Sequence, residues 1–575
     1  MRVAWPENKK RRKMGGARRQ DVRVTVQRMG RRSRLTGLLV GFSASLLLAA
    51  CGPGGGSTAS QASTSAGVLL VCNGSTSPCP RVPHYDTVQA AVNAARPGNW
   101  VLIWPGVYHE NDPAHSAGVW ITTTGLHIRG MNRSTVIIDG SRGTASDPCP
   151  ADPAKQDFTP RDGIVAWRAN SVTIENLTVC NYLAGPGAVH GSQIWWTGNE
   201  DDAAAGGQQG SSDDYGYDSS SSSAGGELGI GAFSGSYLTT TSTYHPSDVK
   251  SQHLAEFGVF VGGASGPGRI THSYASNMAN AAFYVGACGR DCNTLLADDD
   301  GTGSAVGYLG TNSGGKLVIE SSTFDRNRTG MVLLSLNSDD LPPPQDGRCP
   351  SSAVASCTVV RNSDISSNDN AGAPAFGITP TVGVGVEVQG GSYDTIANNR
   401  IADDGSWGVL IGDNVDSLTT LPQSHCQGGT PNIVAASSCL FAARGNRVYD
   451  NAFARNGSFG NPTNGDLAML GLAPVPAAPR NCFYGNNTSG APLTSSPAGI
   501  ETAAVDGAPC GALPGTGENP ALLQQLGCAD GGHCTMRHAH YPVPVTIGTI
   551  PLPALPTMPA PCAGIPRNAF CRAGT

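Results

Sequence analysis

The sequence predicts an all-β solenoid, a fold in which short strands recur once per coil. Four segments recur at equal intervals, at residues 258–261, 282–285, 306–309 and 330–333. Their fixed period indicates a solenoid with about 24 residues in each coil. The second and fourth residues of the segments are mostly apolar, the period of two of a strand with one buried face. The signature returns at 385–388 and 408–411, and the long interval before 385 predicts two turns with an inserted loop.

A second recurring element lies upstream of these segments. It places a β-branched residue five positions before an apolar one, at 174–179, 319–324, 360–365, 396–401 and 448–453. Three residues after most of these elements stand Asn327, Asn368, Asp404 and Asn456. Because Asn and Asp tolerate the left-handed backbone, this column predicts the same tight turn in successive coils.

These repeats resemble the right-handed parallel β-helix of the pectate-lyase-like superfamily, over about residues 85 to 487. An apolar stripe at residues 88–95, with Asp86 as its N-cap, predicts a short cap helix that plugs the first coil. The Gly-x-Tyr-x-Glu stretch at 106–110 also occurs in pectin methylesterases. We expect it to have a structural role, since it is common where β-helices begin.

The amino terminus resembles a bacterial lipoprotein signal. Residues 2–34 hold thirteen Lys and Arg, and an apolar run then closes on Leu48-Ala-Ala-Cys51. The resemblance implies that residues 1–50 are removed and that Cys51 is lipidated. We therefore expect an exported protein on the surface or periplasmic side of the cell envelope, joined to the membrane through the lipid alone. An ordinary cleaved signal is the alternative.

Without residues 1–50, the chain carries 24 Lys and Arg against 41 Asp and Glu, a formal charge of −17. This charge disfavours a nucleic-acid partner, which requires a basic face. It would also repel a polymer of uronate sugars unless a cation bridged the two. The charge thus favours either a bound Ca²⁺ or a neutral glycan.

Sixteen cysteines remain besides Cys51, and in an exported chain an even number predicts a disulfide framework. Zinc is the rival at residues 288 and 292, but no second Cys/His pair stands at a matching distance. Pairing by proximity gives Cys72/Cys79, Cys149/Cys180, Cys288/Cys292, Cys349/Cys357, Cys426/Cys439, Cys482/Cys510, Cys528/Cys534 and Cys562/Cys571.

Composition divides the chain further. Residues 51–84 form a tether with the first disulfide loop, and residues 85–487 form the solenoid. The solenoid carries a Gly/Ser/Asp-rich insertion at about 197–226, expected to be disordered, and a loop insertion at about 341–381. Residues 488–575, rich in Cys and Pro, are expected to form a strap without a core of its own.

A row of aromatic residues is the main candidate for binding. The third positions of the recurring segments include Phe260, Tyr284 and Tyr308, which we expect to face outward on successive coils. Sugar rings stack on such aromatic faces, so the row predicts a polysaccharide partner. The alternative is that the 341–381 insertion or the carboxy-terminal strap covers the row.

Charged residues near this row suggest two chemistries, β-elimination and glycoside hydrolysis. Asp298, Asp299 and Asp300 are candidate Ca²⁺ ligands, and Arg326 or Arg328 is a candidate base for β-elimination on a uronate.

Glycoside hydrolysis would instead require two opposed carboxylates, for which Asp339 with Glu387 are the candidates. The motif sets of methylesterases, polygalacturonases, pectate lyases and alginate epimerases are absent. The sequence thus predicts a polysaccharide lyase or glycoside hydrolase, with a non-catalytic glycan-binding, adhesive or scaffold protein as the alternative.

Overall fold

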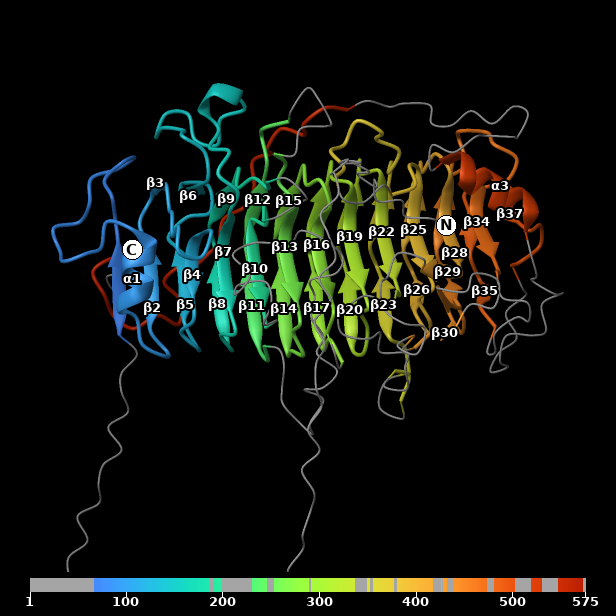
Figure 1. Cartoon of the computed structure of the whole chain (residues 1–575), viewed down its shortest axis with the longest axis horizontal. Helices are drawn as coiled ribbons and strands as arrows, with labels where there is room; N and C mark the ends of the chain where they lie inside the picture. The colour runs from blue at the N-terminus through green and yellow to red at the C-terminus, as the bar shows by residue number, and fades with distance from the viewer. Residues whose placement is uncertain are drawn as a thin grey trace, which may run out of the picture. The chain divides into compact units, whose positions relative to one another are not determined.

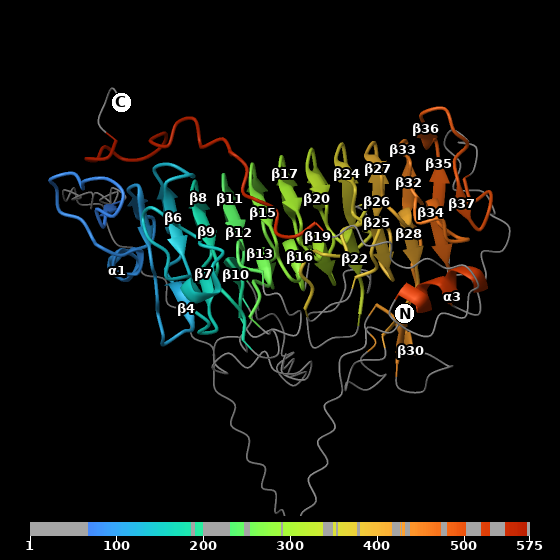
Figure 2. The ribbon, with the colours of Figure 1, turned by 90° about the horizontal axis from the view of Figure 1, so that it is seen from above.

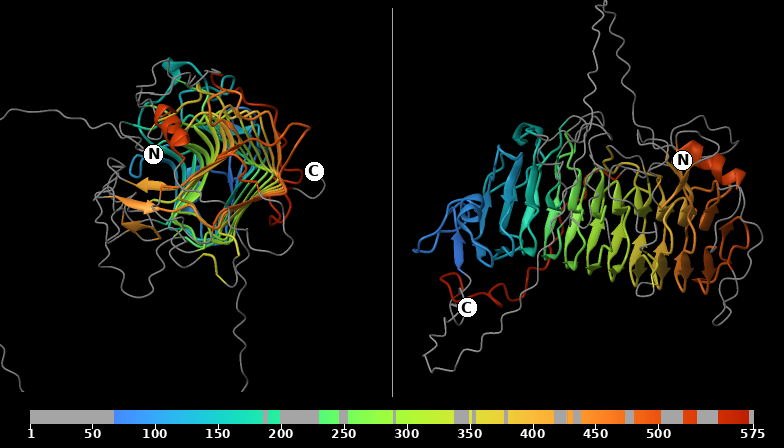
Figure 3. Two further views of the ribbon diagram at one scale, coloured as in Figure 1. Left: turned by 90° about the vertical axis from the view of Figure 1, so that its right-hand side faces the viewer. Right: turned by 60° about the horizontal axis from the view of Figure 1, so that its bottom comes forward.

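The computed structural model describes residues 67–185, 190–198, 230–245, 253–288, 291–336, 349–351, 355–376, 380–416, 426, 428–431, 438–472, 480–501, 519–529 and 547–571. Over these residues the chain winds into a right-handed parallel β-helix, as predicted (Figure 1). Viewed down the coil axis, the successive coils superpose around a single interior (Figure 3, left).

Three parallel sheets, which we name A, B and C, form the walls; β1 begins sheet A, and each coil from β2 onward adds one strand to each sheet in that order. Sheet A contains β1 (Val68–Val71), β2 (Trp100–Ile103), β5 (His127–Gly130), β8 (Val172–Glu175), β11 (Phe233–Ser236), β14 (Gly268–Thr271), β17 (Thr294–Ala297), β20 (Leu317–Glu320), β23 (Thr358–Arg361), β26 (Thr395–Ala397), β32 (Arg447–Tyr449) and β35 (Cys482–Tyr484). Sheet B contains β3 (Gly106–Tyr108), β6 (Val136–Asp139), β9 (Thr178–Cys180), β12 (Thr239–Thr241), β15 (Tyr274–Ser276), β18 (Asp300–Thr302), β21 (Thr323–Asp325), β24 (Asp364–Ser366), β27 (Arg400–Ala402), β33 (Ala452–Ala454) and β36 (Asn487–Thr488). Sheet C contains β4 (Ala117–Ile121), β7 (Asp162–Trp167), β10 (Ile194–Thr197), β13 (Phe257–Gly262), β16 (Ala281–Gly286), β19 (Val306–Thr311), β22 (Thr329–Leu334), β25 (Val384–Gln389), β28 (Trp407–Gly412), β34 (Gly465–Leu470) and β37 (Ser495–Ser496).

Two boundaries differ from the prediction. The solenoid begins at β1, which pairs with β2, inside the segment predicted as a tether. The long interval between the segments at 330–333 and 385–388 is one coil instead of two, because β22 pairs directly with β25. The region predicted as the loop insertion at 341–381 contains β23 and β24, so loops on both sides of these strands lengthen that coil.

At the corner between sheets B and C, the Asn column does not have the role that was predicted for it, since its residues are not the left-handed ones. The left-handed residues are the ones just before it, Arg326, Ser367, Asp403 and Arg455, with φ between 55° and 62°. The column residues are instead turned inward and bond to one another from coil to coil. Asn327 Nδ2 donates to Asn368 Oδ1 at 3.0 Å, and Asn368 Nδ2 donates to Asp404 Oδ1 at 3.2 Å.

A glycine recurs at the second position of most sheet C strands because the coils approach closely there. A β-carbon on Gly330 would lie 2.5 Å from the carbonyl oxygen of Gly385 in the next coil, closer than real contacts allow. The repeated glycine is therefore required for stacking.

Helix α1 (Val88–Ala94) plugs the first coil as predicted, with its apolar stripe buried. Its N-cap is Thr87 and not Asp86, since Thr87 Oγ1 accepts from the Ala90 amide at 3.2 Å. The buried carboxylate of Glu110 accepts from the amides of Val88 and Gln89 at 2.7 and 3.0 Å. The 106–110 stretch thus fixes the cap helix, the structural role that was expected.

Six of the predicted disulfides form, which excludes zinc at Cys288 and Cys292. The six are Cys72–Cys79, Cys149–Cys180, Cys288–Cys292, Cys349–Cys357, Cys426–Cys439 and Cys562–Cys571. The remaining predicted pairs involve Cys510 and Cys534, which lie outside the described residues, as does the lipidation candidate Cys51. The disulfide Cys426–Cys439 ends at the first residue of β31 (Cys439–Phe441). This strand pairs with β29 (Asn414–Asp416) and β30 (Thr430–Pro431) in a small antiparallel sheet.

Residues 547–571 run back along the solenoid toward its first coils (Figure 2, red). Asn277 exchanges two hydrogen bonds with the backbone of Ile550 at 2.8 and 3.0 Å. Near the chain end, Arg129 donates to the carbonyl of Ala563 at 2.8 Å, and the Phe570 ring lies 4.8 Å from Trp104. This segment packs on the outside of the solenoid, where Phe570 shares a cluster with Leu102 of sheet A, and it ties later coils to the first.

Helix α3 (Pro520–Ala529) covers the carboxy-terminal end of sheet C. Leu522 and Leu526 pack there against Trp407, Leu410 and Ala468. Among the described residues, no helix is long and apolar enough to cross a membrane.

Candidate functional site

The outer face of sheet C carries the aromatic residues of interest. The residues in its central column are Cα partners from strand to strand: Trp120, Val165, Trp195, Phe260, Tyr284, Leu309, Val332, Glu387, Leu410 and Ala468. Phe260 and Tyr284 are neighbours in this column, as predicted. The column is mostly aromatic toward the amino-terminal coils and mostly aliphatic, apart from Glu387, toward the carboxy-terminal coils, where α3 packs on Leu410 and Ala468.

Tyr308 does not belong to this column, and the prediction that it faces outward is wrong. Tyr284 pairs with Leu309, one position beyond the regular period, so Leu309 takes the outward position. Tyr308 points into the solenoid, where it is fully buried and its hydroxyl donates to the Val285 carbonyl at 3.2 Å. A single added residue between β16 and β19 thus reverses the face on which Tyr308 lies.

Six side chains form what we call the aromatic row: Trp120, Trp167, Trp195, Phe257, Phe260 and Tyr284. Trp120 stacks on Trp167 with ring centroids 5.5 Å apart, and Trp195 stacks on Phe260 at 5.2 Å. Phe257 lies 4.5 Å from Phe260, which meets Tyr284 edge-on at 4.6 Å. Trp120, Trp167, Phe257 and Phe260 are half-buried, so part of each ring is accessible.

Polar groups lie along the amino-terminal end of this row. The imidazole of His115 stacks on Trp120 at 4.6 Å, and its Nδ1 lies 3.0 Å from Asp112 Oδ2. The exposed guanidinium of Arg168 lies 5.0 Å from the Trp167 ring centroid. The accessible rings are therefore flanked by a cation and an imidazole.

A second histidine is fixed by Asp162, the first residue of β7. His190 Nδ1 lies 2.7 Å from Asp162 Oδ2, and Asp162 Oδ1 accepts from the Ser192 amide at 2.8 Å. Asp162 is the Cα partner of Ala117, which packs in one cluster with Trp120 and Trp195. The Asp162–His190 pair thus lies beside the aromatic row.

Glu256 lies just before β13, next to Phe257 of the row. It is 1 % exposed, and neither carboxyl oxygen has a hydrogen-bond partner. Burial raises the pKa of Glu256 well above its ordinary value, because desolvation disfavours the charged carboxylate.

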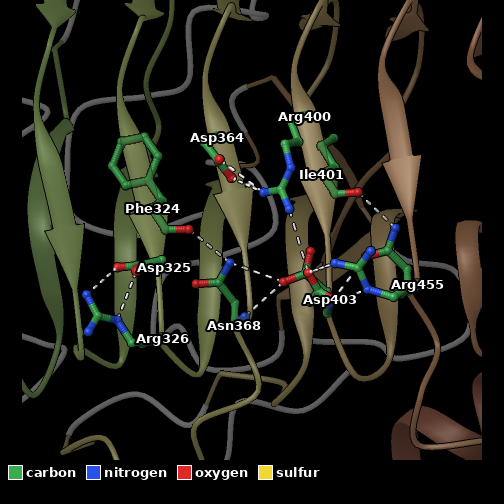
Figure 4. Close-up of polar contacts among 11 residues, drawn as sticks. Phe324, Asp325, Arg326, Asp364, Asn368, Arg400, Ile401, Asp403 and Arg455 are labelled. Atoms are coloured by element: carbon green, nitrogen blue, oxygen red, sulfur yellow. Dashed lines mark hydrogen bonds and ion pairs between the residues drawn. The ribbon is translucent and has the colours of Figure 1, made fainter. Parts of the chain in front are cut away.

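The two candidate arginine bases are engaged elsewhere. Arg326 Nε donates to its neighbour Asp325 at 2.9 Å, at the outer edge of sheet B (Figure 4). Arg328 donates to the carbonyls of Ala371 and Ala373, both at 2.9 Å, and burial lowers its pKa. Arg328 thereby anchors a loop, and neither arginine forms part of the aromatic row.

The three candidate calcium ligands do not converge. Asp299 is fully buried and accepts from the Ser273 amide at 2.8 Å, whereas Asp298 is exposed and lies 3.4 Å from His272. Asp300 is exposed on β18. Among the described residues, the one group of three metal-type side chains is Asp139 with Cys149 and Cys180, and those cysteines form a disulfide.

Glu387 lines a small pocket at the covered end of sheet C, together with Asp413 and Leu526. It is 1 % exposed and accepts from Gln389 Nε2 at 2.7 Å. Both oxygens of Asp413 accept backbone amides, from Ala443 and Leu472, at 2.8 Å. Asp339, the predicted catalytic partner of Glu387, lies outside the described residues.

The sequence analysis missed most of the aromatic row and the Asp162–His190 pair. The equivalent positions Val119, Ile164, Ile194 and Val259 are unequally spaced along the chain, so no fixed period links these coils. The usable signal was the cluster of tryptophans between residues 120 and 196, each next to an apolar residue.

No protein-family model and no curated protein sequence matches the chain. Several solved structures are similar to it. The mannuronan C-5 epimerase AlgE4 A-module of Azotobacter vinelandii has a TM-score of 0.37 and 12 % identity, covering 74 % of this chain and 95 % of that one. An alginate lyase from Paenibacillus sp. str. FPU-7 has a TM-score of 0.34 and 12 % identity, covering 64 % and 94 %. The pectate lyase Pel9A has a TM-score of 0.35 and 11 % identity, covering 68 % and 76 %.

Proposed function

We propose that this protein binds polysaccharide along the outer face of sheet C. The observation that carries the proposal is the aromatic row, which crosses the coils from β4 to β16 on one side of the solenoid. Neighbouring strands lie about 4.8 Å apart, so the row follows the coil axis and suits a linear polymer. Sugar rings present flat apolar faces that stack on aromatic rings, and Arg168 and His115 lie beside the rings of Trp167 and Trp120.

The cellular location is part of the same proposal. The lipoprotein-like leader supports export and a lipid anchor at Cys51, and six disulfides suit an oxidising compartment. Cys51→Ser should release the protein from membrane fractions of the native host. Unchanged fractionation of this variant would contradict the anchor.

Binding can be tested with the purified chain and a panel of neutral and uronate glycans, with and without added Ca²⁺. Trp120→Ala combined with Trp167→Ala should weaken binding by about 1–3 kcal/mol, because two stacking contacts are lost. Dependence of uronate binding on Ca²⁺ would support a bridging cation, as the acidic composition suggests.

Tyr449 and Tyr484 supply a matched control. Their rings stack at 4.9 Å on sheet A, away from the aromatic row. The double alanine variant of this pair should bind glycan as the parent does. Equal losses in the two double variants, or none in the tryptophan variant, would contradict the proposal.

A further inference from the structure

We infer that Asp404 is a pH-sensitive switch built into the corner between sheets B and C, where it holds adjoining coils together while its side chain is protonated. Asp404 takes a position that asparagine takes in the neighbouring coils. It is fully buried, and its Oδ1 accepts from the backbone and side-chain nitrogens of Asn368 at 2.9 and 3.2 Å. Its Oδ2 has no hydrogen-bond partner. The switch is a property of the fold and does not depend on the proposed function.

The sheet C glycines that pack on the column show which atom Oδ2 replaces. A β-carbon on Gly330 would lie 2.7 Å from Asn368 Nδ2. A β-carbon on Gly385, the equivalent residue of the next coil, would lie 2.5 Å from Asp404 Oδ2. Asp404 therefore places a carboxyl oxygen where the preceding coil places an amide nitrogen, which is a hydrogen-bond donor.

The groups around this position accept hydrogen bonds. In the coils on either side of Asp404, the column amides donate to the carbonyls of Phe324 and Ile401, at 3.1 and 3.0 Å. Ile365 is the Cα partner of both of these residues, so its carbonyl is the acceptor at the position of Asp404. A carboxylate has no hydrogen to donate there, whereas a protonated carboxyl group donates through Oδ2.

The following coil offers no donor to Asp404 Oδ2 either. Asn456 Oδ1 accepts from the Asp404 amide at 3.1 Å, and Asn456 Nδ2 donates to the Ile401 carbonyl at 3.0 Å and to Asp466 Oδ1 at 3.1 Å. These three bonds fix the orientation of the Asn456 side chain and use both of its hydrogens. A proton on Asp404 is thus what makes the column continuous.

The charged groups near Asp404 favour its neutral form. Burial raises the pKa of Asp404 well above its ordinary value, the bonds from Asn368 lower it, and the negative charges of Asp369 and Asp403 raise it. Arg455, on the next coil, pairs with Asp403 on the outer side of the corner. The nearest cation is therefore engaged by another acid.

Loss of the proton should open the corner. The carboxylate would hold a buried charge against the Ile365 carbonyl, and this charge is stable only if water reaches it. An aspartate in the unfolded chain has a pKa of about 3.9, so the unfolded chain releases the proton that the closed corner retains. The stability that this proton supplies is fully present below about pH 4 and is lost as the pH rises through the raised pKa of Asp404.

The test compares the full chain with Asp404→Asn, in which an amide can donate to the Ile365 carbonyl at any pH. Unfolding in urea is measured at pH 5 and pH 6. One proton held only by the folded state makes the unfolding equilibrium constant rise about tenfold for each pH unit in this range. The rise should be about tenfold larger in the parent than in Asp404→Asn. The other buried acids, Asp299 and Asp394, are present in both proteins, so the difference measures Asp404 alone.

Asp403→Asn is the matched control, because it changes the adjacent acid on the outer side of the corner. It should leave the rise of the parent nearly unchanged. A second readout is the carboxyl carbon resonance of isotope-labelled aspartate: the signal that Asp404→Asn removes should be that of a neutral acid at pH 6, where an ordinary aspartate is ionised. Equal rises in the parent and in Asp404→Asn, or an ionised signal at pH 6, would overturn the inference. So would failure of Asp404→Asn to fold, since this position requires a donor.

Discussion

Asp403 and Asp404 are adjacent in sequence but lie on opposite sides of the corner between sheets B and C. Asp403 faces solvent, where it accepts from Arg455 Nε at 2.6 Å and lies 3.7 Å from Arg400 (Figure 4). Asp404 is fully buried and accepts from the backbone and side-chain nitrogens of Asn368 at 2.9 and 3.2 Å. The outer side of the corner thus carries exposed ion pairs, and the inner side carries a column of buried hydrogen bonds.

The two sides differ in what they contribute. Buried hydrogen bonds between coils fix their register, and a group left without its partner there pays the full cost of desolvation. Exposed ion pairs are screened by water and salt, and their median contribution is close to zero. The charged clusters that stand out in the sequence therefore contribute little to the stability of this corner. They do not mark the candidate binding face either, since the accessible aromatic rings lie on sheet C.

The largest expected effect concerns Asp394, a buried acid whose Oδ1 accepts from the Thr358 amide at 3.0 Å. Burial raises the pKa of Asp394 from 3.8 to about 7, so the folded state holds a proton that the unfolded state releases. The contribution of this group to the unfolding free energy is therefore highest below pH 4. It falls by on the order of 4 kcal/mol as the pH rises to about 7. Asp394→Asn should remove that pH dependence and raise the unfolding free energy at pH 8, measured by urea unfolding between pH 4 and 8.

Asp364→Asn is the control for this experiment, because Asp364 is an exposed acid paired with Arg400 on sheet B. It should leave the slope of stability against pH nearly unchanged. If Asp394→Asn and Asp364→Asn gave the same pH profile as the parent, the buried acid would not be the source of the effect.

A smaller loss is expected when the amide column is interrupted. Asn368→Ala removes the acceptor of the Asn327 amide groups and the donor to the Phe324 carbonyl, which lies 3.1 Å from Asn368 Nδ2. The unfolding free energy should fall by about 3 kcal/mol, because buried groups left unpaired cost about 1–3 kcal/mol each. Ser367→Ala, one residue earlier, changes a side chain outside the column and is the matched control. Equal stability of the two variants would contradict a role for the column.

The sequence allowed the fold to be predicted because each coil repeats its own local chemistry. The Gly-rich sheet C strands can be recognised where the coil length is constant, and the Asn column can be recognised because each of its residues follows the same local element. The candidate site lies where long insertions separate Asp162, His190 and Phe257, so neither period nor spacing shows that they are neighbours. Tyr308 shows the opposite limit. The fixed period predicts that its side chain faces outward, but one added residue in the coil turns that side chain into the core.

The smallest effects are expected on the outer side of the corner. Arg400 donates to both oxygens of Asp364, at 2.7 and 3.0 Å, but both side chains are more than two-fifths exposed. Arg400→Ala should therefore lower the unfolding free energy by less than about 1 kcal/mol, and the difference should shrink further in 1 M salt, where the Debye length is about 3 Å. Glycan binding should not change, since Arg400 lies on sheet B. A loss comparable to that of Asn368→Ala, or weaker glycan binding, would show that the exposed ion pairs do more than balance charge. Weaker glycan binding would also require the binding face to be extended from sheet C around the corner to sheet B.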